Sequence, residues 1–348
     1  MRHDAIPPLQ SEAAVPSLPF ARIDALLRSE AEEHGLDLHT GHDRSVWCQV
    51  DGGEFGARRE AEGSILYVRA RDRAWLFTLQ EVMTAHLVQV EPDLAALLRW
   101  SGLTHQGALP PNFSFAHVES LTRIGRHFLR LRLRSDDLHR FARDMIHFRL
   151  ILPPAGDKEP QWPMTGANGQ TIWPQGAKAL HRPAYTVRAI DPVAGWLETD
   201  IFIHDGGRAC DWAVHAGTGA RVGLTGPGGG GVPHARRLLI GGDETAYPAL
   251  ARIIEAQAPD VIGDCWLFGA VDDYPLPQHG GIRIHHAAGG EGQLADRLTR
   301  DGTDAERIWL ATEKSRIPSL RKAVLDKLGF PKRSAHLAGY WSADGTAM

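Results

Sequence analysis

Residues 182–188 read RPAYTVR, and this segment decides how the middle of the chain is interpreted. Its aromatic and β-branched residues favour a β-strand. A flavin needs a cation for its pyrophosphate, an aromatic face against the isoalloxazine ring and a small hydrogen-bonding group near N5. Arg182, Tyr185 and Thr186 are therefore candidate flavin contacts, although arginines and tyrosines on strands more often cover an exposed sheet face.

Short strand patterns surround this segment on both sides. In residues 126–134, RHFLRLRLR, leucines alternate with arginines, which places the leucines on one face of a sheet and the arginines on the other. Residues 197–204, LETDIFIH, alternate in the same way. These patterns predict a small antiparallel β-barrel, with the proline- and glycine-rich residues 153–174 as a long loop within it. The other strand patterns are 146–152, 184–190 and 220–226.

After a glycine run at 228–231, strands alternate with helices. This order predicts a mostly parallel sheet with helical crossovers, the architecture of a nucleotide-binding domain. The expected strands are 236–242, 264–271, 281–288, 307–312 and 335–341, and the expected helices are 245–257, 292–300 and 319–329.

The first third of the chain predicts a smaller α+β domain over residues 20–102, with helices near both of its ends and a strand at 64–70. Residues 1–19, rich in proline, alanine and serine, are expected to form a flexible arm, and residues 103–111 a linker. No chemistry is assigned to this domain. Its single residues Trp47, Cys48 and His86 are interpreted as packing residues.

Composition limits the functional classes. The 348 residues carry a formal net charge of −4, so there is no basic surplus for nucleic acid. The three cysteines, Cys48, Cys210 and Cys265, form neither a disulfide framework nor a metal-binding pair, and no residue spacing suggests a permanent metal site. No apolar run approaches the ~20 residues that span a bilayer. We therefore expect a cytoplasmic protein without stable membrane insertion.

Two further segments carry phosphate-binding features. Residues 204–213, HDGGRACDWA, place a glycine-rich turn before a helix, whose free N–H groups attract a phosphate. Residues 241–250, GGDETAYPAL, follow a predicted parallel strand, where Thr245 and nearby N–H groups can hold part of NAD(P)H. The alternatives are an ordinary turn with Trp212 as a core anchor, and a helix that Asp243 or Thr245 merely caps.

Together, in this order, the three segments resemble the siderophore-interacting protein family, a branch of the ferredoxin–NADP reductase superfamily. The resemblance covers residues 112–345 and includes a late acidic stretch and a terminal GYW motif. It implies an FAD-binding Greek-key barrel of six strands over residues 112–232 and a Rossmann-like NAD(P)H-binding α/β domain over residues 233–348. In this family, flavin reductases reduce ferric siderophores, which are anionic and are attracted by basic residues.

The resemblance also implies the roles of individual residues. Tyr185 and Thr186 are the expected catalytic contacts, and Arg149 is either a substrate contact or a surface arginine. The family pattern is broken at Cys210, which is followed by Asp211, and at Ser342, where relatives often have an arginine. The expected cofactor- and coenzyme-binding residues are Arg182, Tyr185, Thr186, Val187, Arg188, His204, Cys210, Trp212, Ala213, Asp243, Glu244, Thr245, Ala246, Tyr340 and Trp341.

The expected function is reduction of a ferric siderophore by NAD(P)H through FAD, which releases Fe(II). A flavin oxidoreductase with another electron acceptor is the first alternative, and a siderophore- or flavin-binding module without turnover is the second. The choice between NADH and NADPH stays open, since Arg252 either binds a 2′-phosphate or faces solvent. The siderophore and the oligomeric state are also open.

Overall fold

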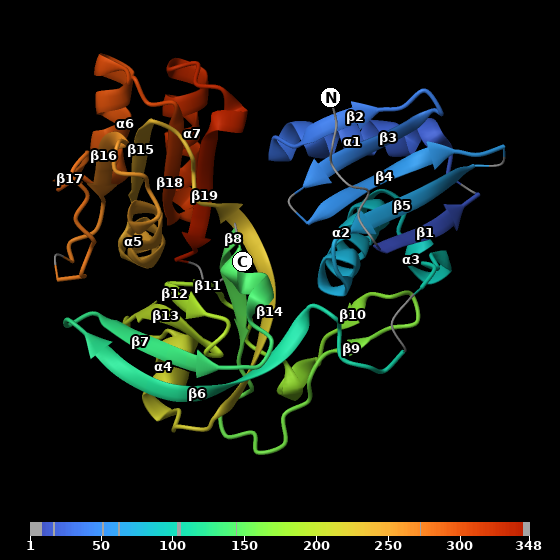
Figure 1. Cartoon of the computed structure of the whole chain (residues 1–348), viewed down its shortest axis with the longest axis horizontal. Coiled ribbons are helices and arrows are strands. Elements are labelled where there is room, and N and C mark those ends of the chain that lie inside the picture. The colour runs from blue at the N-terminus through green and yellow to red at the C-terminus, as the bar shows by residue number, and fades with distance from the viewer. Residues whose placement is uncertain are drawn as a thin grey trace. The chain divides into compact units, whose positions relative to one another are not determined.

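The computed structural model describes residues 9–343 except 17, 51, 62, 103–105, 144 and 272. The chain forms two compact units (Figure 1). The N-terminal unit contains the residues up to Phe113 together with Gly156–Leu180, and the C-terminal unit contains Ser114–Ala155 and the residues from His181 onward. Within the described ranges, no helix has the length and apolar character needed to cross a membrane.

The N-terminal unit is built on a five-stranded antiparallel sheet in the order β1-β5-β4-β3-β2. Helices α1 and α2 contribute the buried side chains Leu27 and Phe77 to its core. The elements are β1 (Leu9–Val15), α1 (Phe20–His34), β2 (Asp37–Thr40), β3 (Ser45–Val50), β4 (Gly53–Arg59), β5 (Ser64–Ala70), α2 (Arg73–Val90) and α3 (Leu94–Leu97).

Strand β1 corrects the expectation of a flexible arm over residues 1–19. Residues 9–15 pair along their whole length with β5 and bury Ser11, Ala13 and Val15. The buried side chains are small and one is polar, so the alternation is weak as a sequence signal. The pairing with β5 makes the strand, and residues 1–8 lie outside the described residues.

The long loop expected within the barrel belongs instead to the N-terminal unit over Gly156–Leu180. It contains the hairpin β9 (Met164–Thr165) and β10 (Thr171–Ile172), and the short helix η2 (Gly176–Lys178). The Thr171 N–H donates to the Glu81 carboxylate on α2 at 2.8 Å. Gly107 and Ala108, in the expected linker, pair with Thr165 through the backbone. These long-range bonds attach the loop to the first unit.

The C-terminal unit begins with a seven-stranded sheet in the order β11-β8-β14-β6-β7-β13-β12, whose registered pairs are antiparallel. The single strand expected at 184–190 is divided into β11 and β12, so there are seven strands rather than six. The elements are β6 (Phe113–Ile124), β7 (Phe128–Arg134), η1 (His139–Ala142), β8 (Met145–Ile151), β11 (Ala184–Thr186), β12 (Ala189–Asp191), β13 (Trp196–Phe202), α4 (Arg208–His215) and β14 (Arg221–Gly231).

The division of that strand closes the barrel. The two edge strands β11 and β12 are consecutive in the chain, and the residues between them bond to both edges. The Val187 N–H donates to the Ile146 carbonyl on β8, and the Arg188 N–H donates to the Glu198 carbonyl on β13, both at 2.8 Å. The chain leaves one edge and joins the other here, which satisfies backbone groups that an open sheet would expose.

The alternation in β7 places its leucines on one face of the sheet and its arginines on the other, as predicted. Leu131 and Leu133 are fully buried in the barrel, and each contributes about 1.5–3 kcal/mol by burial. On the other face, the guanidinium of Arg130 pairs with Asp200 at 2.8 Å, and that of Arg132 with Glu198 at 3.0 Å. The arginines of this strand are thus neutralised by neighbouring strands and belong to the barrel wall.

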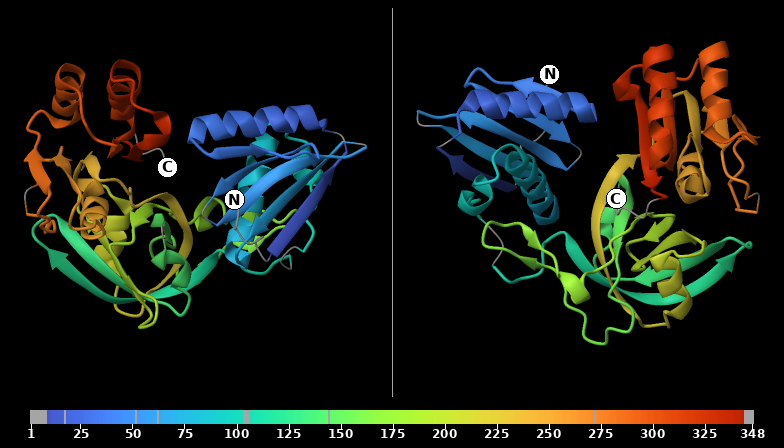
Figure 2. Two further views of the ribbon diagram at one scale, coloured as in Figure 1. Left: turned by 45° about the horizontal axis from the view of Figure 1, so that its top comes forward. Right: turned by 180° about the vertical axis from the view of Figure 1, so that it is seen from behind.

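A five-stranded parallel sheet follows in the order β17-β16-β15-β18-β19, as the strand–helix alternation predicts. Helix α5 covers one face of this sheet, and α6 and α7 cover the other (Figure 2). The order reverses at β15, so a ligand site is expected at its carboxyl end. The elements are β15 (Arg237–Gly242), η3 (Glu244–Ala246), α5 (Tyr247–Glu255), β16 (Ile262–Leu267), β17 (Ile282–His286), α6 (Gly290–Asp301), β18 (Arg307–Glu313), η4 (Lys314–Arg316), α7 (Ile317–Arg321), η5 (Lys322–Lys327), η6 (Lys332–Ser334) and β19 (Ala335–Trp341).

Candidate functional site

Three arginines lie on β8, just before β11 and at the start of α4. Arg149 on β8 donates from Nη1 to the carbonyl of Arg182 at 3.0 Å. Desolvation and the charge of Arg149 lower the pKa of Arg182. Burial and the charge of Arg208, the first residue of α4, lower the pKa of His181 to about 4. We call Arg149, Arg182 and Arg208 the arginine cluster, which is a site suited to an anion.

The N-terminus of α4 adds backbone donors to this cluster. Gly207 precedes the helix, and a Cβ atom at this position would lie 2.7 Å from Nε2 of His204. The exposed His204 ring stacks on Phe202 with 6.2 Å between centroids. A side chain at position 207 would therefore collide with the His204 ring, which packs against the start of the helix. The exposed Asp211 lies in that turn and is the acidic departure noted in the sequence.

Three of the expected residues on α4 pack against the barrel. Cys210 is buried, and its thiol donates to the Phe202 carbonyl at 3.0 Å, which ties α4 to the end of β13. Burial raises the pKa of this thiol. Ala213 is buried, and Trp212 is partly buried against the barrel core. These residues set the position of the helix, whereas Arg208 at its start is exposed.

The central pair Tyr185 and Thr186 point to opposite faces of β11. Tyr185 pairs with Phe148 and packs at the margin of the barrel core, where burial raises its pKa. Thr186 pairs with His147, and directly paired residues share a face. Thr186 is buried with 4% exposure, and Tyr185 is partly exposed.

Val187 and Arg188, which follow Thr186, join the barrel to α5. Val187 is fully buried, and its carbonyl accepts a hydrogen bond from Nη1 of Arg252. The Arg188 guanidinium binds both carboxylate oxygens of Glu255 at 2.6 and 2.7 Å. Both arginines are therefore engaged at this junction, and Arg252 is directed to the barrel rather than to solvent.

Asp243 joins the carboxyl ends of three parallel strands. Its Oδ1 accepts from the N–H and hydroxyl of Thr245 at 3.1 and 2.6 Å. Its Oδ2 accepts from the Thr312 hydroxyl at 3.0 Å and from Nε1 of Trp341 at 2.9 Å. Four donors satisfy this buried carboxylate. Asp243 therefore caps the short helix η3, and it also anchors β18 and β19.

In the same turn, Ala246 and Glu244 contact their neighbours, and Thr245 is partly exposed. Ala246 is fully buried below the turn. Oε1 of Glu244 accepts from the Ala270 N–H at 2.9 Å, and a Cβ atom at Gly269 would lie 2.1 Å from the Glu244 carboxyl carbon. Thr245 is partly exposed. The turn after β15 is therefore held by its own side chains and keeps its backbone in place beside β16.

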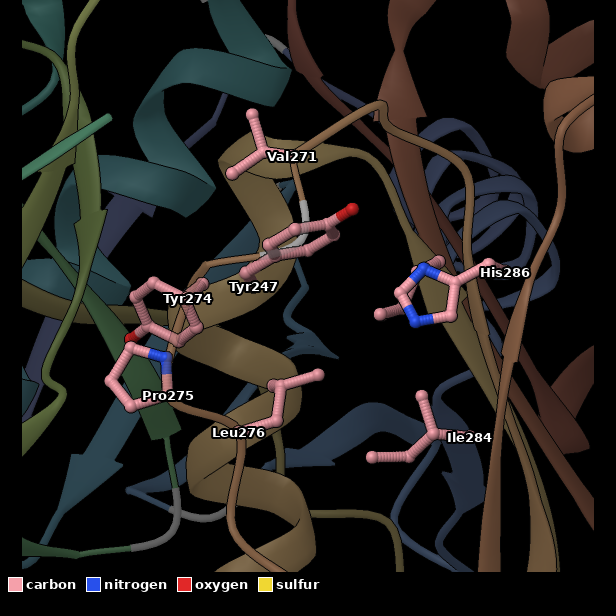
Figure 3. A pocket seen from close by; sticks show the side chains of 8 residues that line it. Tyr247, Val271, Tyr274, Pro275, Leu276, Ile284 and His286 are labelled. Carbon is pink, nitrogen blue, oxygen red and sulfur yellow. The ribbon is translucent and has the colours of Figure 1, made fainter. Parts of the chain in front are cut away.

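A hollow of about 250 Å³ lies beside this turn, at the carboxyl ends of β16 and β17 (Figure 3). Tyr247, the first residue of α5, crosses the middle of the hollow. Ile284 and His286 line it from β17, and Val271 and Leu276 line it from the segment between the two strands. Its walls are aromatic and aliphatic, as is typical of pockets that bind a ring system.

Tyr340 on β19 reaches the barrel at His147. The Tyr340 hydroxyl and Nε2 of His147 are 2.5 Å apart, and the Tyr340 ring stands edge-on to Trp309. Burial, His336 and Arg252 lower the pKa of His147 to about 3, so its ring is neutral and accepts from the protonated phenol. The neighbouring Trp341 is 40% exposed.

The sequence motifs did not single out three residues of this region. Arg208 lies inside the quoted HDGGRACDWA segment and could have been recognised as the first helical residue. Tyr247 lies inside GGDETAYPAL, but nothing local indicates that its hydroxyl is buried. His147 becomes notable only through Tyr340, which is 193 positions away.

Two sequence family models match the C-terminal unit. One, described as the Siderophore-interacting FAD-binding domain, matches residues 117–231. The other, described as Siderophore-interacting protein, matches residues 235–344. Together they include the arginine cluster, the β15 turn and the terminal Tyr340.

Individual relatives agree with these matches. The mycobactin import ATP-binding/permease protein IrtA of Mycolicibacterium thermoresistibile is 27% identical over 61% of this chain, but the match spans only 25% of IrtA. The ferric vibriobactin reductase ViuB of Vibrio cholerae is 31% identical over 56% of this chain and 70% of ViuB. The siderophore-interacting protein SipS from Aeromonas hydrophila has the same fold, with a TM-score of 0.55, 20% identity and coverage of 67% of this chain and 92% of SipS.

Proposed function

Because this chain belongs to the siderophore-interacting family of FAD-binding, ferredoxin-reductase-like proteins, we propose that it is an NAD(P)H-dependent reductase of ferric siderophores. The arginine cluster at the N-terminus of α4 is the observation that carries this proposal. It places positive charge on a barrel that forms one compact unit with the five-stranded parallel sheet.

The chemistry of the arginine cluster fits an FAD pyrophosphate. Arg182 and Arg208 offer guanidinium donors, and the first turn of α4 adds N–H groups at the positive end of its dipole. Gly207 lets the His204 ring pack against the start of the helix, because a Cβ atom there would lie 2.7 Å from that ring. Tyr185 offers a partly exposed aromatic ring for the flavin, whereas the Thr186 hydroxyl is buried on the opposite face of β11. When bound, FAD supplies the conversion between two-electron and one-electron transfer.

For the coenzyme, the turn after β15 and the hollow beside Tyr247 provide a continuous edge of the sheet. This is the edge at which open parallel sheets bind dinucleotides. Asp243 holds the turn, and Thr245 remains partly exposed for a contact. Orientation of the nicotinamide towards the barrel is then the protein's contribution to electron transfer.

The acceptor is proposed to be an anionic ferric chelate. Arg149 is exposed beside Arg182, so it can attract a negatively charged siderophore to the barrel. Hard oxygen ligands prefer Fe(III), and reduction to Fe(II) weakens their hold on the metal. The ferric ion is the substrate here, and its release is the biological result.

An absorption spectrum of the purified protein tests the first step. We expect a yellow protein whose flavin band is bleached by anaerobic NADH or NADPH and is restored by a ferric siderophore. Restoration by quinones or ferredoxin, but not by ferric chelates, would indicate the flavin oxidoreductase with another acceptor. A protein that cannot take up FAD would instead indicate the binding module without turnover.

Variants of the arginine cluster test where FAD binds. Arg208→Ala should weaken FAD binding roughly tenfold or more, since a charge-assisted hydrogen bond is lost. Arg300→Ala is the matched control, because that exposed arginine pairs with Asp301 at 2.8 Å on α6. Fluorescence quenching of FAD measures both affinities. Equal affinities in the two variants would remove Arg208 from the site.

A further inference from the structure

The hollow at the carboxyl ends of β16 and β17 is well placed for one half of the coenzyme. In open parallel sheets, the first strand–helix turn faces the pyrophosphate, and the end of the neighbouring strand faces the adenosine ribose. Here the first turn follows β15, and β16 is its neighbour on the side of the hollow. Leu267, the last residue of β16, lines the hollow. An adenosine is therefore the fragment that this position predicts.

Tyr247 supplies an independent observation that points to a ligand. Its side chain is 1% exposed, and its O–H has no hydrogen-bond acceptor in the described part of the chain, whereas the Gly269 N–H approaches the phenol oxygen as a donor. Burial, with the charge of Glu244, raises the pKa of this phenol, so it stays protonated and able to donate. Buried polar groups rarely remain unsatisfied, because losing water without a replacement costs free energy. A ligand hydroxyl or ring nitrogen in the hollow would satisfy this group (Figure 3).

Charge in the hollow distinguishes the two coenzymes. Alternation along β17 directs Ile284 and His286 into the hollow. It turns Arg283 and His285 to the other face, where both bind Asp264 at 3.2 and 2.6 Å. None of the described residues that line the hollow is a lysine or an arginine.

The helix beside the hollow does not supply the missing cation. Arg252 on α5 donates to the Val187 carbonyl of the barrel and is therefore engaged elsewhere. The carboxylate of Glu244 lies close enough to raise the pKa of Tyr247. A 2′-phosphate needs guanidinium or ammonium donors, and a nearby carboxylate repels it.

We infer that the coenzyme is NADH rather than NADPH, and that the Tyr247 hydroxyl binds the adenosine half of NADH. This inference rests on the proposed function, because it assigns the coenzyme of the same reductase. It makes Tyr247 an adenosine-binding residue and the uncharged wall of the hollow the feature that selects NADH, and it leaves the arginine cluster to FAD and the ferric acceptor.

Binding of two nucleotides to the FAD-loaded protein tests the inference without turnover. Isothermal titration calorimetry compares 5′-AMP with adenosine 2′,5′-bisphosphate, which differs only by the 2′-phosphate. We expect 5′-AMP to bind about tenfold more tightly. Tyr247→Phe should weaken 5′-AMP binding about fivefold to tenfold, the net effect of one hydrogen bond. Its melting temperature should change little, because the deleted O–H has no acceptor among the described residues.

A second variant adds a positive charge to the hollow. Ile284 is 40% exposed at the hollow, and Ile284→Arg adds a cation there without filling the interior. We expect the bisphosphate to gain about tenfold in affinity and 5′-AMP to change little. Tyr67→Phe is the matched control, since it removes the hydroxyl of a buried tyrosine in the N-terminal unit. It should leave both nucleotide affinities as they are in the unmodified protein.

Equal or tighter binding of the bisphosphate by the unmodified protein would overturn the inference, as would unchanged 5′-AMP affinity in Tyr247→Phe. Anaerobic bleaching of the flavin distinguishes a failure of the coenzyme assignment from a failure of the proposed function. Faster bleaching by NADPH than by NADH would overturn the coenzyme assignment while the reductase stands. Bleaching by neither coenzyme would overturn the reductase and the NADH assignment together.

Discussion

The contact between Tyr340 and His147 predicts an acid response of known sign. His147 lies on β8 and is faced by His336 and Tyr340 from β19 and by Arg252 from α5. Burial, followed by the charges of His336 and Arg252, lowers its pKa from 6.5 to about 3. Protonation would also remove the acceptor for the Tyr340 hydroxyl. The folded protein therefore holds this ring neutral in a range where the unfolded chain protonates it.

The difference between the pKa of His147 in the unfolded and folded states sets the size of the stability loss. At pH 7.5 the ring is neutral in both states, and the stability contribution is fully present. Between 6.5 and about 3, only the unfolded chain binds the proton, so stability falls as the pH is lowered. At pH 5 this amounts to about 2 kcal/mol, obtained from 2.303RT for each pH unit below 6.5.

Replacement of the imidazole by a group that does not titrate isolates this contribution. His147→Gln keeps a hydrogen-bonding group near Tyr340. Its loss of stability from pH 7.5 to pH 5 should be about 2 kcal/mol smaller than that of the unmodified protein. Urea unfolding followed by tryptophan fluorescence measures both values. His234→Gln, at an exposed position in the loop before β15, serves as the control and should respond to acid like the unmodified protein.

An equal loss of stability in His147→Gln and the unmodified protein would refute the reasoning. It would mean that His147 is not held neutral, and that the junction between β8 and β19 admits solvent. A smaller loss in His234→Gln would show instead that the difference is not specific to the buried ring.

Three further predictions concern the positions around the site. Gly229→Ala should cost about 1–3 kcal/mol in urea unfolding, because Gly229 has φ +72° and its Cβ would lie 2.7 Å from Nδ1 of His147; an unchanged midpoint would contradict the close approach. Asp243→Asn should cost about 1–3 kcal/mol and raise the KM for the coenzyme, since an amide cannot accept from all four donors; a stable variant with an unchanged KM would contradict the anchoring role. Leu131→Ala should cost about 2–5 kcal/mol by opening a cavity in the barrel, measured as a fall in melting temperature, with exposed Val193→Ala as a control that changes little.

The sequence by itself determined the elements whose signal is local. Alternating leucines and arginines at 128–134 predict a half-buried strand, because successive side chains point to opposite faces. Strand and helix alternation after residue 232 predicts the parallel sheet, and the segment GGDETAYPAL predicts the turn at its carboxyl edge. These inferences needed only residues within one element or its neighbours.

Only the tertiary structure decided which residues meet. The strand β1 owes its existence to β5, and Gly156–Leu180 joins the N-terminal unit through bonds such as Thr171 to Glu81. The arginine cluster draws on three separate segments. Burial is a sum over neighbours that are remote in the chain, so no local pattern could show that Asp243 is satisfied and that the Tyr247 O–H has no acceptor among the described residues.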